Sequence, residues 1–532
     1  MHLHTLHELD STEGTVQLHS PSSSAELILH PTPSATDPND PLRWPRRKKH
    51  VAFASVCAFA SVCAFAFLSN YGIGGLAPAF YRLSLEFDKT PPETSALLLW
   101  PILVFGCFNF FWVPLSNYIG KRPVFAFASL LLCISYVWGA CATTFDSLLW
   151  SNIVGAFAGS STEALGAAMV NDLYFLHERG AKMGIYMNAI AGGNTVGPLI
   201  CGFVVQSLGW RWHKWIAVVF TAVNWLVVVF FCPETRYLPL RTRDVAASSS
   251  DMSIPVFDGE AGPAAVAETT DSTEKGLSAE SPRSSLSQVP KKSWSQEMSL
   301  RSGVPADTNL FKMFIRPLPL LAYPAVIFAF LGYAVSLAWV VAINILNSFV
   351  LQAPPYNWGA SINIPGLLGN LFGAFAGGWM VDRYCDWRSK KNGGVFRPEY
   401  RLDLLVVPAV LAPAGCLVFG YGVQETLDWT SLFFGYGMVA VALTAVPCIT
   451  MSYVSDALLP VAADALLLVN GLKNIVAFGF LYGVIPWVAK VGYVGSFGAQ
   501  AGIFVAIMAL AIPLSIFGQR IRHRVGQWRI IL

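Results

Sequence analysis

Two ionisable side chains stand inside long apolar stretches of the sequence. Glu163 lies in the stretch 149–171, and Lys473 lies in the stretch 465–488. If these stretches cross a lipid bilayer, a charged group at that depth is costly, and such groups therefore tend to pair or to mark a pathway. We take Glu163 and Lys473 as the first candidates for handling a charge or a proton.

The two residues are expected to lie at a similar depth. Glu163 is eight residues from Asn171, and Lys473 is eight residues beyond Ala465, which is ~12 Å in a helix that rises about 1.5 Å per residue. We therefore expect them to meet, and we hypothesise that protonation of Glu163 alternates with substrate binding. The alternatives are a static ion pair that orients the helices and a lysine that extends to the membrane interface.

Polar side chains accompany both residues. Helical spacing puts Asn152 on the face of Glu163, and Asn470 and Asn474 lie beside Lys473. Further candidates for the same cavity are Tyr333, Ser336, Trp339, Asn344 and Asn347. A tryptophan offers a surface on which a flat or cationic ligand can stack. The alternative for the aromatic residues is helix packing or an interfacial belt.

The composition indicates that these residues are held by membrane helices. Hydrophobic residues make up 54% of the 532 and charged residues only 13%, whereas soluble chains carry roughly 25% charged residues. The net charge of +3 and the scattered basic residues do not suggest a nucleic-acid partner. No catalytic motif and no metal-ligand spacing is visible, so we expect neither an enzyme nor a cofactor or metal site.

Twelve apolar stretches are long enough to span a bilayer, which takes about 20 residues. They lie near 51–69, 96–116, 123–143, 149–171, 183–207, 215–232, 318–349, 359–381, 403–424, 431–454, 465–488 and 495–518. This pattern predicts an all-α integral membrane protein with twelve transmembrane helices in two six-helix bundles.

The same pattern predicts the domain organisation and the orientation. We expect a disordered tail (1–50), a first bundle (51–232), a flexible linker (233–317), a second bundle (318–518) and a tail (519–532). With a cytosolic amino terminus, 29 basic residues are cytosolic, and five lie outside, namely Arg82, Lys89, Arg211, Lys214 and Lys490. Because cytosolic loops carry the excess of Lys and Arg, both termini are predicted to be cytosolic.

Two loops carry related motifs. The first, 113–123, contains Asn117, Gly120, Lys121 and Arg122, and the second, 378–383, contains Asp382 and Arg383. Glycine allows close helix approach, and an acidic side chain can pair with a neighbouring helix end, which makes a breakable latch. The first loop resembles the Gly-x-Leu-Ala-Asp-x-x-Gly-Arg-Lys motif of the major facilitator superfamily, with Val113 and Asn117 in place of its first Gly and its Asp. The loop 378–383 resembles another copy of this motif and retains the Asp.

A third motif, in the stretch 183–207, consists of Gly193, Gly197, Pro198 and Gly202. It resembles the Gly-x-x-x-Gly-Pro-x-x-Gly-Gly signature of the antiporter branches, with Cys201 in place of one glycine. Small residues let helices pack closely, and proline bends them. The likeness extends to nearly the whole chain and is to fungal drug:proton antiporters. Asn152 stands at the position where that branch carries a motif arginine. Because this arginine is absent here, the resemblance implies that proton coupling depends on Glu163 instead.

The resemblance implies a transporter of the plasma membrane that exports a small amphipathic organic compound, such as a drug, toxin or secondary metabolite, in exchange for protons. Its partners would be this substrate, protons and the lipid bilayer, and we expect it to work as a monomer. One alternative is a proton symporter that imports a polyamine-like cation or nutrient. Another, from a different class, is a membrane sensor that does not transport.

Overall fold

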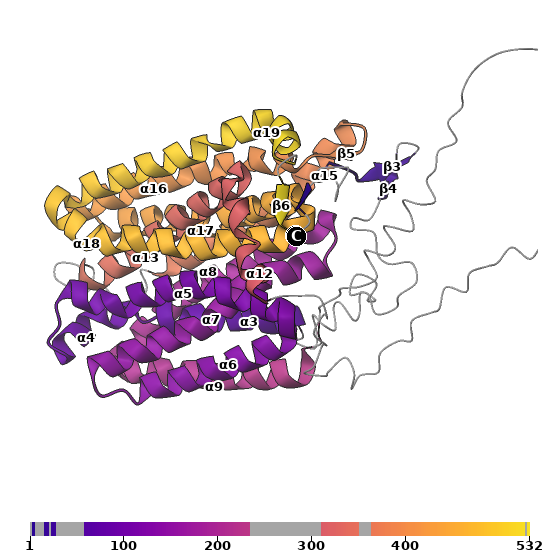
Figure 1. Ribbon diagram of the computed structural model, residues 1–532. Helices are drawn as coiled ribbons and strands as arrows, with labels where there is room; N and C mark the ends of the chain where they lie inside the picture. The colour runs from indigo at the N-terminus through magenta and orange to yellow at the C-terminus, as the bar shows by residue number, and fades with distance from the viewer. Residues whose placement is uncertain are drawn as a thin grey trace, which may run out of the picture.

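The computed structural model of the protein is a bundle of long helices (Figure 1). It describes residues 3–5, 15–20, 23–27, 58–232, 234, 310–350, 363–526 and 529–531. In these ranges, 11 helical segments are long and apolar enough to cross a membrane. The last of them breaks at Gly492, whose φ of 80° is not helical. Counting its two parts separately gives the twelve spans that the sequence predicted.

Helices of the first six spans follow the apolar stretches closely. They are α3 (Ala58–Gly74) with η2 (Ala77–Ala79) and α4 (Phe80–Glu86), α5 (Pro91–Ile119), α6 (Lys121–Ala140), α7 (Phe145–Leu173), α8 (Leu176–Ser207) and α9 (Trp210–Phe231). Local signals set several of their ends. Thr90 and Glu93 form a capping box at the start of α5, and Gly120 and Gly209, both with positive φ, separate successive helices.

The second six spans contain more irregular turns. Their elements are α12 (Leu310–Ile315), η3 (Leu318–Ala322), α13 (Pro324–Val350), α14 (Ile364–Ala374), η5 (Phe375–Met380), α15 (Val381–Lys391), η6 (Pro398–Leu405), α16 (Val406–Gln424), α17 (Trp429–Ala457), η7 (Leu459–Val461), α18 (Ala462–Ala509) and α19 (Ala511–Gly526). The π-helical η5 interrupts one continuous span. At this turn Gly377 packs against Ala445 of α17, and Gly378 packs against Gly184 of α8.

In the described residues, six short strands lie outside the spans and form three antiparallel pairs. They are β1 (Leu3–Thr5), β2 (Val16–Gln17), β3 (His19–Ser20), β4 (Ser23–Leu27), β5 (Val395–Phe396) and β6 (Arg529–Ile531). β1 pairs with β6, β2 with β5 and β3 with β4. The described residues of the predicted amino-terminal tail are therefore largely strands, and α12 lies within the predicted linker. Residues 234, 316 and 317 of this linker are also described, and what remains of both segments lies outside the described residues.

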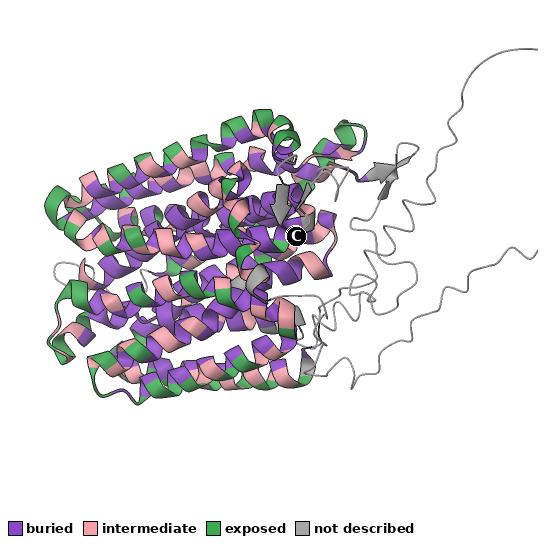
Figure 2. Ribbon diagram, viewed as in Figure 1, coloured by how far each residue is buried: buried purple, intermediate pink, exposed green. Residues whose placement is uncertain are grey.

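Burial decreases from the middle of the bundle to its surface (Figure 2). The inner helices α7, α13 and α17 are mostly buried, whereas α9 and α16 expose much of their surface. Glycines allow the closest contacts. A Cβ added at Gly193 or Gly197 of α8 would lie within 3 Å of atoms of α3 or the turn that follows it. Pro198 lies within the same helix, and Gly202 is buried there. This is the close packing that the glycine motif predicted.

Helices of the two sets meet along several contacts in the described residues. α18 lies against α5 and α7, α8 lies against α14 and α17, and α13 lies against α4 and the turn η2. We call the end of the bundle that carries Gly120 and β5 the basic end, because the loops at this end contain most of the Lys and Arg residues. The other end, with Gly209 and Gly492, is the opposite end.

Candidate functional site

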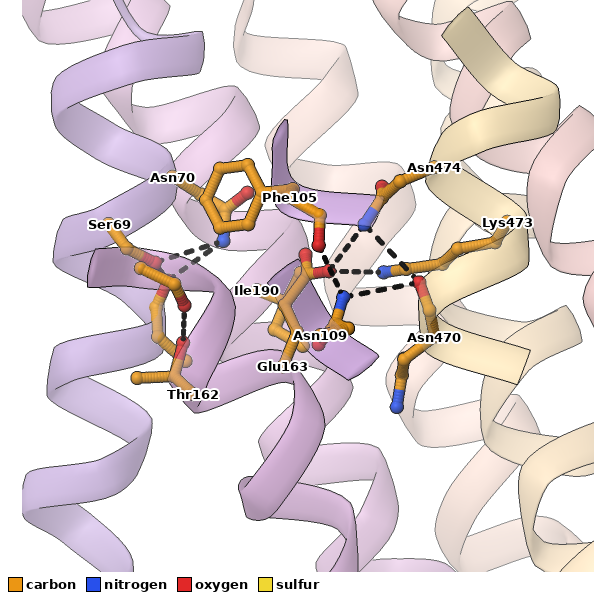
Figure 3. Close-up of polar contacts among 12 residues, drawn as sticks. Ser69, Asn70, Phe105, Asn109, Thr162, Glu163, Ile190, Asn470, Lys473 and Asn474 are labelled. Carbon is orange, nitrogen blue, oxygen red and sulfur yellow. Dashed lines mark hydrogen bonds and ion pairs between the residues drawn. The ribbon is translucent and has the colours of Figure 1, made fainter. Parts of the chain in front are cut away.

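Glu163 of α7 and Lys473 of α18 meet inside the bundle (Figure 3). The Lys473 Nζ lies 3.2 Å from Glu163 Oε2, and the two residues are both buried, with Lys473 0% and Glu163 3% exposed. Asn474 Nδ2 donates a hydrogen bond to the same carboxylate oxygen at 2.8 Å. The two deep charges found in the sequence thus form a buried ion pair between the first and the second six spans.

An aromatic ring and two amides surround this pair. The Lys473 Nζ lies 3.9 Å from the centroid of the Tyr333 ring, a favourable cation–π distance. Asn109 of α5 donates to the Asn470 backbone oxygen at 3.4 Å. The side-chain amide of Asn470 is buried, and neither of its polar atoms has a hydrogen-bond partner in the part of the chain that the structure describes. The Asn470 amide therefore has unused hydrogen-bonding capacity in this part of the structure.

α13 continues this polar surface away from the ion pair. The Trp339 ring packs edge-on against Phe480 with centroids 5.3 Å apart, while its Nε1 has no hydrogen-bond partner among the described residues. Both polar atoms of the Asn347 side chain are buried, and neither has a hydrogen-bond partner among the described residues. Ser336 donates to the Gly332 oxygen of its own helix. Trp339 and Asn347 thus offer unsatisfied hydrogen-bonding groups.

Asn344 belongs to a different set of contacts, nearer the opposite end. Its Nδ2 donates to the Asn194 oxygen of α8 at 3.2 Å, and its Oδ1 accepts from Tyr436 at 2.8 Å. Close by, Asn370 Nδ2 donates to Thr195 at 3.2 Å. These contacts join the two halves through neutral groups. Asn194, Asn370 and Tyr436 were not predicted as site residues, although two amides inside apolar stretches were a usable signal.

Asn152 does not lie with Glu163. Its Oδ1 accepts from Lys214 Nζ at 2.7 Å, and its Nδ2 donates to the Leu97 oxygen at 3.2 Å, both within the first six spans. Lys214 is only 1% exposed, so the expectation that it lies in an outer loop was wrong. The reason is that α9 begins at Trp210, earlier than the predicted start of that span at 215.

A charged network joins the two halves at the basic end. Asp382 Oδ2 accepts from the Ala181 backbone N–H of α8 at 2.6 Å, and Asp382 Oδ1 binds Arg401 at 2.9 Å. Asp456 of α17 lies 2.6 Å from Arg401 and 2.8 Å from Arg179 of α8. We call Arg179, Asp382, Arg401 and Asp456 the latch.

The other predicted gating residues are not in the latch. Lys121 pairs with Asp172, and the backbone N–H groups of Lys121 and Arg122 each donate to the Glu234 carboxylate at 3.2 Å. The Arg122 guanidinium also donates to the Val229 oxygen at 2.7 Å. The motif around Gly120 is therefore held within the first six spans. Asn117 is half-buried at the end of α5.

Arg383 is exposed, with its guanidinium 5.9 Å from the centroid of the Trp379 ring. Of the predicted gating residues, Asp382 is the one whose contacts cross between the halves among the described residues. Arg179, Arg401 and Asp456 were not predicted as site residues, because charges near helix ends are common and carry little information on their own.

The arrangement provides three polar layers along the contact between the halves. The latch lies at the basic end, the ion pair of Glu163 and Lys473 lies in the interior, and neutral amide contacts lie towards the opposite end. Ion pairs break when a carboxylate takes up a proton, whereas the amide contacts do not respond to protons in this way. Chemically, the interior therefore combines an ion pair that joins the two halves with hydrogen-bonding groups that have no partner among the described residues.

Comparisons with known proteins agree with this architecture. A sequence profile of the Major Facilitator Superfamily matches residues 59–464. An uncharacterized MFS-type transporter of Schizosaccharomyces pombe is 23% identical over 93% of this chain and 88% of its own length. The efflux pump radE of Floropilus chiversii is 25% identical over 91% and 83%.

Among solved structures, the human organic anion transporter MFSD10 matches with a TM-score of 0.49 and 17% identity, over 87% of this chain and 99% of its own. The family is decided by the profile, since it extends over most of the chain, from α3 to the start of α18. The protein described here belongs to the major facilitator superfamily of membrane transporters.

Proposed function

We propose that the protein is a proton-coupled secondary transporter that exports a small amphipathic organic compound by alternating access. The observation that carries this proposal is the buried contact between Glu163 of the first six spans and Lys473 of the second, with 3.2 Å between their charged atoms. The efflux pump among the relatives supports the direction of transport. The charge asymmetry of the loops supports the proposal that both termini lie in the cytosol, and the resemblance to fungal drug:proton antiporters supports the plasma membrane as its location.

Proton coupling follows from the electrostatics of this pair. A proton on Glu163 removes the charge that neutralises Lys473, and an unpaired ammonium in the interior is costly. Protonation therefore weakens a contact that holds the two halves together, and loss of the proton restores it. In the proposed cycle, a proton entering from outside discharges Glu163 and promotes release of the substrate.

The surroundings of the pair favour a neutral substrate over a polyamine-like cation. The Glu163 carboxylate is already paired with the Lys473 ammonium, which also lies over the Tyr333 ring, so this carboxylate is not left unpaired to bind a cationic ligand. The unpartnered polar atoms of Asn470, Asn347 and Trp339 suit an organic molecule that has hydrogen-bonding groups on an apolar frame.

The proposal is tested by transport in proteoliposomes with an imposed pH gradient. Wild-type protein is expected to move members of a panel of fluorescent amphipathic neutral and anionic compounds against their gradients when protons flow the other way. Glu163→Gln is expected to lose this pH dependence while still folding and binding the compounds. Transport in the same direction as the protons would favour the symporter instead.

A matched control is Glu425→Gln, which removes an exposed carboxylate and is expected to transport like the wild type. Binding of a compound in the Glu163→Gln variant, measured by fluorescence polarisation, separates loss of coupling from loss of folding. Undiminished pH-driven transport by Glu163→Gln would refute the role of Glu163 in coupling.

A further inference from the structure

An amino-terminal segment is packed against the second half of the molecule at the basic end. β2 pairs with β5, with Val16 opposite Phe396, and the Leu18 backbone N–H donates to the Gly394 oxygen at 2.9 Å. Val16 and Leu18 are only 7% and 4% exposed. We call the segment Thr15–Leu18 the strap. Its two apolar side chains are buried although they come from the predicted disordered tail.

A buried ion pair holds the first residue of the strap. Arg522 of α19 binds Glu399 of η6 through two contacts, of 2.8 and 3.1 Å, and its guanidinium also donates to Thr15 Oγ1 at 3.4 Å. Arg522 and Glu399 are both more than nine-tenths buried. Thr15 is therefore tied through the Arg522 guanidinium to a buried charged contact of the second half.

The strap also reaches the latch. Val16 pairs with Phe396, which is 1% exposed, and the guanidinium carbon of Arg401 lies 5.8 Å from the centroid of the Phe396 ring. Arg401 is the residue of the latch that binds both Asp382 and Asp456. The strap therefore covers the aromatic ring beside the central arginine of the latch.

The location of its contacts shows how the strap can act. About 40 residues separate Leu18 from α3. The contacts described above for the strap, with β5 and with Arg522 of α19, all lie in the second half. Any effect of the strap on the latch must pass through its local contacts with β5, Phe396 and Arg522.

We propose that the strap is a regulatory ligand carried by the chain itself. When docked, it fixes Phe396 and thereby Arg401, which keeps the latch formed and the basic end closed. When released, it loosens the latch and makes opening of that end easier. This control does not depend on which compound is transported or on the role of Glu163 in coupling.

Hydrogen exchange of the full-length protein in lipid nanodiscs, measured by mass spectrometry, tests the proposal. Val16→Asp and Leu18→Asp each put a charge at a buried position of the strap. Thr12→Asp, which adds the same charge three residues before the strap, is the control. Both strap variants are expected to speed exchange in residues 394–396 and at the Ala181 amide, which binds Asp382, by roughly tenfold.

The outcomes separate a working strap from a passive one. The proposal holds if the exchange rates at β5 and at Ala181 rise together in both strap variants. The exchange rates of the control variant and the melting temperatures of all variants must meanwhile stay at wild-type values. It is overturned if residues 394–396 are unprotected in the wild type. It is equally overturned if the strap variants free β5 but leave Ala181 unchanged, or if Thr12→Asp speeds exchange as much as Val16→Asp does.

Discussion

At the scale of single residues, the interior of the molecule depends on a charge pair that neither half can satisfy alone. Glu163 and Lys473 come from different sets of six spans, and their charged atoms lie 3.2 Å apart. Removing one partner leaves an uncompensated buried charge, whereas removing both leaves neutral groups of similar shape. The pair therefore has a signature in stability that is independent of transport.

Lys473→Met is expected to lower the free energy of unfolding by about 3–5 kcal/mol, because it leaves Glu163 buried without a cation. The double variant Glu163→Gln with Lys473→Met should recover most of this loss. Chemical unfolding of the purified protein in mixed detergent micelles, followed for both single variants and the double variant, measures the coupling. Losses that simply add in the double variant would show that the two side chains do not interact.

The sequence contained enough information to identify Glu163 and Lys473, because a charge inside an apolar stretch is unusual. It did not identify Arg401 or Asp456, since charges near helix ends are ordinary and only the tertiary fold brings these two together. Lys214 was misplaced for a related reason. Trp210 to Lys214 contain both polar and aromatic residues, so hydropathy alone placed the start of α9 too late.

At the scale of elements, the helices were predictable and their contacts were less so. Apolar length located the spans, and the glycines of α8 indicated a close neighbour, which proved to be α3. The pairing of β2 with β5 was not predictable, because two residues carry no periodic pattern. The repeated loop motif indicated two related turns, but the sequence did not show that the copy with Asp382 would be the one to contact the other half.

The latch predicts how the elements at the basic end respond to loss of one charge. Asp382→Asn removes a counter-charge of Arg401 and should weaken the contact of α15 with α8. Cys448 lies beside this contact, buried, with its Sγ 3.5 Å from the Gly180 oxygen. We expect N-ethylmaleimide to modify Cys448 roughly tenfold faster in Asp382→Asn, because the basic end opens more often.

Arg383→Gln is the matched control, since Arg383 is the next residue in the chain but is less buried and contacts Trp379. Its modification rate at Cys448, determined by peptide mass spectrometry, should equal that of the wild type. Equal rates in Asp382→Asn and the wild type would mean that the charged contacts do not keep this end closed.

At the scale of the whole molecule, contacts between the halves are present at the basic end, in the interior and towards the opposite end at once. The proposed alternating access requires that one end separates while the other stays joined. Because the basic end is held by charges and the other by neutral amides, the two ends differ in their response to salt and protons. The halves must nevertheless part at the basic end in every cycle.

A reversible cross-link tests this requirement directly. A Cβ added at Gly184 of α8 would lie 3.6 Å from the Sγ of Cys448 of α17, which is within reach of a disulfide after small side-chain rotation. In Gly184→Cys, oxidation should therefore join the halves at the basic end and abolish transport of any compound that the wild-type protein carries, and reduction should restore it. Gly184→Ser adds the same Cβ without a thiol, so oxidation should not change its transport rate. If the cross-linked protein transports at the rate of its reduced form, the halves do not need to separate at this end, and alternating access through it is wrong.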